Sequence, residues 1–167
     1  MSTTKNLSNE EAIEKLKNLA EGKMCLFCTH DNRKLESRPM GASQVDESGD
    51  IWFFSAKNSN KNRQIEANPE VYLMFIESGK QHYLSLTTEV SIVDDQQKVD
   101  ELWNGFMKAW FPGGKQDPEI SLLRASVVSG HYWDEKDGHL IGMLKAGLKA
   151  LTAGKTDDGA LEGDINV

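Results

Sequence analysis

Apolar and polar residues alternate in six segments of the chain, and this alternation is typical of half-buried β-strands. The predicted strands span residues 24–30, 35–45, 51–55, 71–77, 82–93 and 123–133. Turn-forming residues separate neighbouring strands, so consecutive strands are expected to pair as antiparallel neighbours. The pattern therefore predicts a mainly β protein of the α+β class, built as a six-stranded antiparallel barrel that is closed or nearly closed.

Apolar residues recur at helical spacing between the strands and near both ends of the chain, which predicts peripheral helices. The expected helical segments span residues 8–22, 59–68, 94–106, a short turn at 117–122, and 140–154. Ser8 and Glu11 have the spacing of a capping box, and Pro69 stops the second helix. The third helix is expected to place Trp103 and Phe106 on its buried face.

The length of 167 residues fits one domain with one core. We assign residues 1–153 to this domain and residues 154–167 to a polar, acidic C-terminal tail, which is expected to be loose unless a partner subunit holds it. No apolar run approaches the roughly 20 residues that a membrane-spanning helix needs. Residues 1–23 lack the apolar centre of a secretory signal, so the protein is expected in the cytoplasm and not in a membrane.

Cys25 and Cys28 have a spacing that also occurs in redox and zinc sites. The surrounding segment favours a β-strand, in which residues three positions apart point to opposite faces. Zinc would need a second pair of ligands, and the four histidines of the chain are scattered. We therefore expect two buried thiols that form neither a disulfide nor a metal site.

Strong catalytic signatures are missing from the sequence, which has no nucleophile-elbow, Walker A or dinucleotide-binding glycine motif. Ligand binding is thus a better expectation than catalysis by a side-chain nucleophile. The net charge of −7 argues against a nucleic-acid partner, because such a partner demands a basic surface.

One part of this acidic chain is basic. Between Arg33 and Arg63, six basic residues outnumber four acidic ones. Arg38 lies in the second predicted strand, and Ser59 and Lys61 open the helix that follows the third. A guanidinium, an ammonium, hydroxyls and a helix N-terminus are the groups that a phosphate monoester needs. Pro39 cannot donate a hydrogen bond to a sheet, so its strand is expected at an edge, where backbone groups are free for a ligand.

Several short motifs follow one another in a characteristic order. They are S-R-P-M (37–40), W-F-F-S (52–55), S-N-K (59–61) before a helix that ends in N-P, W-F-P-G-G (110–114), D-P-E-x-x-L-L-R (117–124) and Y-W-D (132–134). In this order and spacing the chain resembles the general stress protein 26 group of the pyridoxamine 5′-phosphate oxidase-like FMN-binding split barrels. The resemblance covers residues 7–133. It implies a six-stranded antiparallel split β-barrel with peripheral helices.

The same resemblance implies FMN as cofactor and a homodimer with its two flavin sites at the subunit interface. Carried over by motif, Arg38 and Lys61 would hold the phosphate, with Ser55 and Ser59 adding hydroxyl contacts. The wall of the flavin would be formed by Pro39, Met40, Phe53 and Phe54. Trp110 is expected in a loop at the site and at the dimer interface, and Trp103 or Trp133 of the other subunit are alternatives for covering the ring.

Three functions are left open by the sequence. The protein is a flavin oxidoreductase, a flavin-binding stress protein without a dedicated reaction, or a split barrel that lacks FMN or uses F420 or haem. A true pyridoxamine 5′-phosphate oxidase is disfavoured, because the oxidase reads its substrate's phosphate with basic residues in its C-terminal part. Arg124 is the only arginine after Arg63 in this chain.

Overall fold

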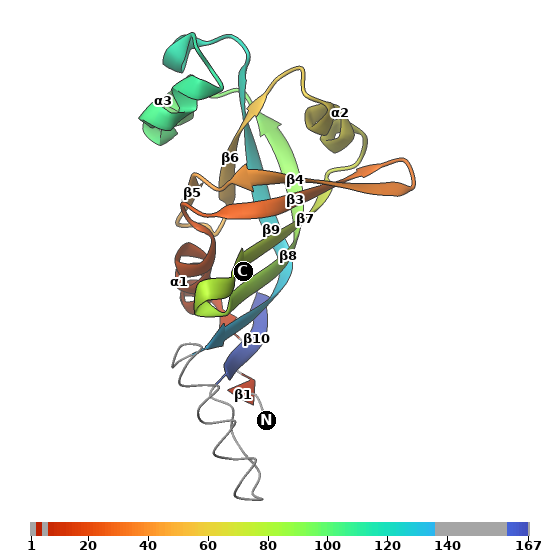
Figure 1. The fold of residues 1–167 in the computed structure, drawn as a ribbon, viewed down its shortest axis with the longest axis vertical. Coiled ribbons are helices and arrows are strands. Elements are labelled where there is room, and N and C mark those ends of the chain that lie inside the picture. The colour runs from red at the N-terminus through yellow and green to blue at the C-terminus, as the bar shows by residue number, and fades with distance from the viewer. Residues whose placement is uncertain (1–2, 5–6, 136–159, 167) are drawn as a thin grey trace, which may run out of the picture.

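The computed structural model describes residues 3–4, 7–135 and 160–166, and Figure 1 shows their arrangement. In chain order the elements are β1 (Thr3–Thr4), β2 (Leu7–Ser8), α1 (Asn9–Ala20), β3 (Met24–Asp31), β4 (Lys34–Gly41), β5 (Gln44–Val45), β6 (Ile51–Ala56), α2 (Asn60–Ala67), β7 (Glu70–Glu77), η1 (Ser78–Lys80), β8 (His82–Val93), α3 (Gln96–Leu102), η2 (Gly105–Ala109), η3 (Gly114–Gln116), β9 (Ile120–Glu135) and β10 (Ala160–Asn166). Within these described residues, no helix is long and apolar enough to cross a membrane.

The strands form one strongly curved sheet that is mainly antiparallel. Its path runs β1-β10-β9-β8-β7-β3-β4, and β6 pairs with the first half of β9. The sixteen-residue β9 is the organising strand, because it pairs with β6, β8 and β10 along its length. Among the described residues β4 pairs only with β3, and β6 only with β5 and β9. The barrel is therefore open between β4 and β6.

The core follows from the alternation of residues along the strands. In β8 the side chains of Leu84, Leu86, Thr88 and Val90 are buried, and the residues between them are more exposed. Inside the barrel these side chains meet the apolar face of α1, while Phe27 of β3 packs edge-on against Phe53 of β6 (ring centroids 5.3 Å apart). A second apolar cluster lies between β6, the start of β9 and α3.

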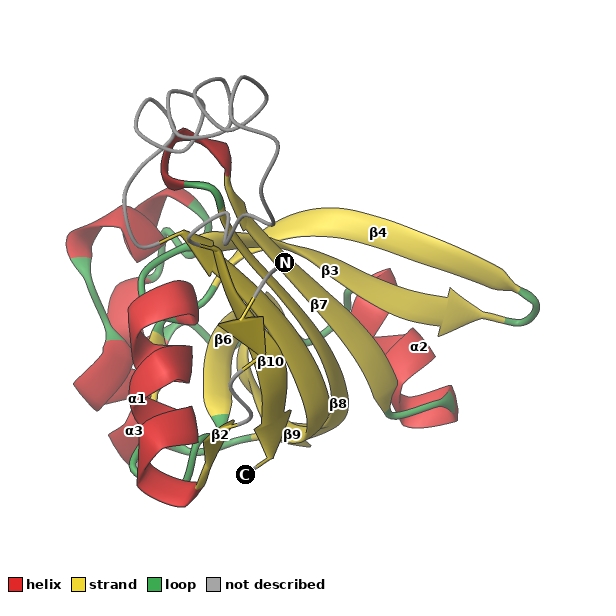
Figure 2. Cartoon of the chain, turned by 90° about the horizontal axis from the view of Figure 1, so that it is seen from below, coloured by secondary structure: helices red, strands yellow, loops and turns green. Residues whose placement is uncertain are grey.

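The six predicted strands correspond to β3, β4, β6, β7, β8 and β9, so the prediction of an antiparallel β-barrel with peripheral helices is confirmed. The helices expected at 8–22 and 59–68 are α1 and α2. Figure 2 shows α1 and α3 on one side of the sheet, while α2 lies beneath the projecting β3–β4 hairpin. The helix expected at 140–154 lies outside the described residues.

Three details of the sequence analysis need correction. Residues 117–122 do not form a helical turn, because β9 begins at Ile120. Phe106 does not lie on the buried face of a long helix: α3 ends at Leu102, and Phe106 lies in η2 with 83% of its surface exposed. Residues 160–166 are not a loose tail, since they form β10, which pairs with β9 and buries Ile165 completely.

Both cysteines are buried, as expected, and neither forms a disulfide in this structure. The described residues contain no cluster of metal-ligating side chains. Cys25 faces the barrel core, and burial raises the pKa of its thiol to about 12. Burial also raises the pKa of Cys28, although the nearby charge of Arg38 opposes this rise. Both thiols are therefore protonated and unreactive at neutral pH.

Candidate functional site

A pocket of about 890 Å³ lies at the opening between β4 and β6. Its walls come mainly from the second half of β4, the end of β6, the start of α2 and the segment around η2, with Gly22 and Met24 added at the start of β3. The volume falls within the range of about 300–1,000 Å³ that is usual for ligand and cofactor sites. The pocket thus exists because β4 and β6 do not pair with each other; in a closed barrel, paired strands would occupy this space.

The edge position of β4 explains why this wall of the pocket has free backbone groups. Pro39 faces Leu26 of β3 in the sheet register, and its nitrogen carries no hydrogen. A proline is tolerated there because the other edge of β4 has no partner strand among the described residues. Residues 38–43 of this edge line the pocket, and β5 begins at Gln44.

Arg38 is held in place by two neighbouring elements. Its Nη1 donates to Thr29 Oγ1 of β3 at 2.6 Å, and its Nη2 donates to Gln64 Oε1 of α2 at 3.1 Å. The same Nη2 lies 3.2 Å from the exposed carboxylate of Glu36, which also accepts from Gln64 Nε2 at 2.7 Å. The guanidinium is therefore fixed at the pocket, and Glu36 of its own strand is the one carboxylate paired with it among the residues that the structure describes.

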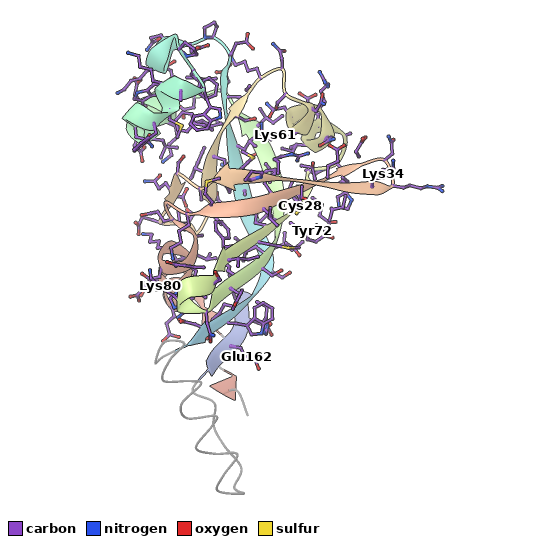
Figure 3. All side chains as sticks on the ribbon, viewed as in Figure 1. Cys28, Lys34, Lys61, Tyr72, Lys80 and Glu162 are labelled. Atoms are coloured by element: carbon purple, nitrogen blue, oxygen red, sulfur yellow. The ribbon has the colours of Figure 1, made fainter. Side chains whose placement is uncertain are left out.

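Lys61 adds a second positive charge to the same end of the pocket. In Figure 3 its side chain lies beside α2, whereas Lys34 projects from the far tip of the β3–β4 hairpin. Partial burial and the charge of Arg38 lower the pKa of Lys61 to about 8. Its Nζ donates to Ser59 Oγ at 3.2 Å. Two cations that disfavour one another are stabilised together by an anion, so this end of the pocket is suited to a phosphate or a similar group.

Hydroxyl groups and a helix N-terminus complete the polar end. Ser59 caps α2 by accepting a hydrogen bond from the backbone nitrogen of Asn62. Ser55, at the end of β6, lies within 3.4 Å of Ser59 through their Oγ atoms. Both hydroxyls donate to Asn62 Oδ1, at 2.5 Å from Ser55 and 3.0 Å from Ser59. The N-terminus of α2 also contributes partial positive charge toward the same region.

The remainder of the pocket is largely apolar. Phe54 and Phe111 are nearly fully buried, with ring centroids 6.3 Å apart, and they form the deep wall. Trp110 and Phe106 line the mouth of the pocket and are 73% and 83% exposed. One pocket thus offers an anion site at one end and aromatic surface at the other.

Eight of the nine site residues proposed from the sequence line this pocket: Arg38, Pro39, Met40, Phe54, Ser55, Ser59, Lys61 and Trp110. Phe53 is the exception, because strand alternation turns its side chain into the barrel core, where it is fully buried against Phe27. Trp103 packs against Phe54 within the same chain, and Trp133 lies on the outer face of the sheet.

Several residues that position the functional side chains were not predicted from the sequence. Gln64 and Thr29 position Arg38, and Asn62 joins the two serines. A signal for Thr29 was present: a two-residue turn at 32–33 sets a hairpin register in which residues 27, 29, 36 and 38 share one face. Asn62 gave no such signal, since an asparagine in the first turn of a helix is usually solvated.

Fold and pocket together define a split-barrel protein whose pocket is cationic at one end and aromatic at the other. The family model described as "Pyridoxamine 5'-phosphate oxidase like" matches residues 11–158. The chain belongs to this family.

Solved structures support the same fold. A candidate general stress protein 26 from Jannaschia sp. CCS1 is 24% identical and has a TM-score of 0.72, with 91% of this chain and 94% of that chain covered. The general stress FMN/FAD binding protein from Xanthomonas citri is 27% identical with a TM-score of 0.64, covering 74% of this chain and 87% of that chain.

Among curated proteins, the protein bli-3 of Neurospora crassa is 26% identical over 125 residues, which cover 68% of this chain. The chain spans 60% of the length of that relative.

Proposed function

We propose that this protein binds FMN in the pocket between β4 and β6, with the phosphate at Arg38 and Lys61. One observation carries the proposal: two cations, two hydroxyls and a helix N-terminus meet at one end of a pocket whose other walls are apolar and aromatic. A phosphate dianion needs the cationic end, and a flat heteroaromatic ring needs the apolar, aromatic walls; FMN contains both groups. The Xanthomonas neighbour is described as FMN/FAD binding, and a Nostoc punctiforme neighbour as FMN binding, which agrees with this proposal.

Titration with three flavins tests the proposal. FMN should bind tightly enough to quench its fluorescence at micromolar protein, and riboflavin should bind more weakly because it lacks the phosphate. FAD distinguishes a site for a monoester from one for a diphosphate. A protein that purifies colourless and changes the fluorescence of none of these flavins would rule the proposal out. A red preparation would instead indicate haem.

A bound flavin supplies hydride and electron chemistry, and this chain would bind and orient it. Arg38 and Lys61 suffice for one phosphate group. Arg124 does not line the pocket and lies 3.7 Å from Asp50, so it offers no second phosphate site there. We therefore propose a flavin-binding stress protein that does not act as a pyridoxamine 5′-phosphate oxidase. Anaerobic mixing of the FMN complex with NADH or NADPH separates an oxidoreductase, whose flavin bleaches, from a flavin carrier.

Glu36 competes with the phosphate for Arg38, which leads to a prediction. Glu36→Gln keeps the shape of the side chain and removes its negative charge, so FMN affinity should rise by about 1.5- to fivefold, the range of an exposed charge pair. Glu119→Gln is the matched control, because Glu119 is an exposed carboxylate that does not line the pocket. FMN titration in low salt is the measurement. Weaker FMN binding to the Glu36→Gln variant would mean that Glu36 helps to orient Arg38 instead of competing for it.

We further propose that the protein is a homodimer, and that the second copy covers the outer face of the sheet. Cross-strand register places six exposed apolar residues together on this face: Met24, Leu26, Met74, Ile76, Tyr83 and Trp133. A contiguous apolar surface of this kind marks an interface in proteins that are not membrane-bound. Met24 lies on this face and also lines the pocket, so a copy seated there would border the flavin. Phe111 is buried within its own chain, which leaves Trp110 and Phe106 as the exposed aromatic residues of the loop.

The mass of the protein in solution tests the dimer. Wild type should elute as a dimer at micromolar concentration in size-exclusion chromatography with light scattering. Met74→Asp places a charge at the centre of the apolar face, next to Leu26, and should yield monomers. Val128→Asp, at an exposed apolar position outside this group of residues, should leave the dimer intact. A monomeric wild type would contradict the dimer, and a dimeric Met74→Asp variant would place the interface elsewhere.

A further inference from the structure

Asn62 is a buried amide that lies behind the polar end of the pocket. It is 2% exposed, and it does not line the pocket. Its Oδ1 accepts from the hydroxyls of Ser55 and Ser59, and its Nδ2 donates to Ser121 Oγ at 3.0 Å. Ser121, on β9, donates in turn to the backbone oxygen of Ser55 at 3.1 Å. Asn62 thus joins α2, β6 and β9 through side-chain hydrogen bonds.

The direction of these hydrogen bonds conflicts with anion binding. A hydroxyl has one hydrogen, and the hydrogens of Ser55 and Ser59 are both directed to Asn62 Oδ1. In this arrangement neither hydroxyl has a hydrogen left to donate to a phosphate oxygen. The two hydroxyls can donate to an anion only if Asn62 no longer accepts from them.

A half-turn of the amide resolves the conflict with a small shift of Ser55 Oγ, because an N–H···O hydrogen bond is longer than the present 2.5 Å contact. It exchanges the places of Oδ1 and Nδ2, which have nearly the same shape. Nδ2 then donates one hydrogen to each of Ser55 Oγ and Ser59 Oγ, and Oδ1 accepts from the hydroxyl of Ser121. Every polar atom of the buried amide keeps a partner, and the cost of the turn is the hydrogen bond from Ser121 to the backbone oxygen of Ser55.

Lys61 links this half-turn to the arrival of an anion. Ser59 Oγ has two lone pairs, and both are occupied: one accepts from the backbone nitrogen of Asn62 and the other from Lys61 Nζ. An anion that draws Lys61 to itself frees the second lone pair, which the turned amide can then fill. The lysine and the asparagine therefore change partners together.

We propose that Asn62 is a positioning residue whose amide turns when a phosphate group enters the pocket, so that Ser55 and Ser59 donate to the phosphate. This inference rests on the proposed function for its ligand, the phosphate of FMN. The amide is the element with two states, and the anion favours the state that exposes the hydroxyl hydrogens. Riboflavin has no phosphate and would leave the amide in the orientation seen in the structure.

The test is a double-mutant cycle around Asn62→Asp. The carboxylate has the shape of the amide but accepts only, so it holds both hydroxyl hydrogens away from the pocket in either orientation. FMN affinity should fall at least about tenfold, the effect of a lost hydrogen bond to a charged group. In the Ser55→Ala/Ser59→Ala background there are no hydroxyl hydrogens to hold, so the same substitution should change affinity by less than about twofold. Riboflavin binding should respond to none of these variants.

Two outcomes would overturn the role of Asn62. An equal loss in both backgrounds would show that the new charge simply repels the phosphate, and unchanged FMN binding would show that the amide is structural. Inorganic phosphate, monitored by its effect on the Tm, serves as a second probe. If wild type binds phosphate but no flavin, the proposed function fails, and the same cycle with phosphate still decides the role of Asn62.

A measurement on wild type covers the case in which the Asn62→Asp variant does not fold. The two side-chain amide hydrogens of Asn62 give a characteristic pair of signals in a nitrogen–proton correlation spectrum. FMN and inorganic phosphate should shift this pair strongly, because the hydrogens exchange Ser121 for Ser55 and Ser59. Riboflavin should not. A pair that stays in place when phosphate binds would refute the half-turn.

Discussion

Arg38→Ala is expected to weaken FMN binding by about 10- to 100-fold, more than the truncation of any other side chain in the pocket. The guanidinium can meet two phosphate oxygens at once, and one charge-assisted contact of this kind contributes about 1.5–3 kcal/mol. Thr29 and Gln64 already hold Arg38 at the rim, so little conformational freedom is lost when the phosphate binds. Lys61→Ala should cost less, because an ammonium makes single contacts and Lys61 must first take up its full charge.

Riboflavin provides the internal control for this result. Its binding should hardly change in the Arg38→Ala variant, because it has no phosphate for Arg38 to contact. Gln64→Ala is a second comparison: it removes one support of Arg38 and should produce a smaller loss of the same FMN-specific kind. Circular dichroism checks the fold of each variant. Equal losses for FMN and riboflavin would mean that Arg38 acts on the fold of the pocket and not on the phosphate.

The alternating strands could be predicted because one face of each strand is buried and the other is exposed. Apolar and polar residues therefore alternate along the sequence, and this alternation is recognisable without a structure. The start of β9 could not be predicted in this way. Ile120 and Leu122 enter the cluster beside α3, while Leu123 and Ala125 enter the barrel core, so both faces are apolar and alternation is lost. Residues 117–122 were assigned to a short helical turn, which took in the first residues of the strand.

The C-terminal strand was concealed for the opposite reason. Residues 160–166 include Glu162, Gly163, Asp164 and Asn166 and show no run of apolar residues, and Ile165 is fully buried next to the exposed Asp164. What makes this segment a strand is its pairing with the far half of β9, which reaches beyond β6 and offers a free edge. Pairing of this kind depends on how far a neighbouring strand extends, so it cannot be predicted from the composition of the segment itself.

The residues of the candidate site also fall into two groups, those that the sequence predicted and those that only the structure identifies. Arg38, Lys61 and the two serines could be found because their chemistry matches a phosphate and their motifs keep a known order. The residues that orient them, Gln64 and Asn62, are recognised only from tertiary contacts. Phe53 was assigned to the flavin wall because the resemblance carried Phe53 and Phe54 over together, although neighbours on a strand face opposite sides.

FMN affinity is expected to fall about tenfold between about pH 7 and about pH 9, because Lys61 loses its proton in this range. In the free protein, burial and the charge of Arg38 lower the pKa of Lys61 to about 8. A bound phosphate dianion reverses the preference and raises this pKa again. Binding above the free-state pKa therefore requires uptake of a proton, and each unit of pH then costs up to about a factor of ten.

The stability of the free protein should change with pH in the opposite direction. The pKa of Lys61 is lower in the folded state than in the unfolded chain, where a lysine titrates near 10.5. Between these two values the unfolded chain binds more protons, so the contribution of Lys61 to the free energy of unfolding rises with pH. FMN should remove this rise, because the bound phosphate restores the proton to the folded state.

Lys61→Arg is the decisive variant for this titration. Arginine stays charged throughout the range, so its FMN affinity should be nearly independent of pH while remaining above that of Lys61→Ala. Riboflavin affinity should be flat for wild type and both variants, since no phosphate is present to couple to the lysine. The measurement is FMN and riboflavin titration at several pH values in buffers of equal ionic strength. A pH dependence that survives unchanged in the Lys61→Arg variant would assign the proton to another group and remove Lys61 from the phosphate site.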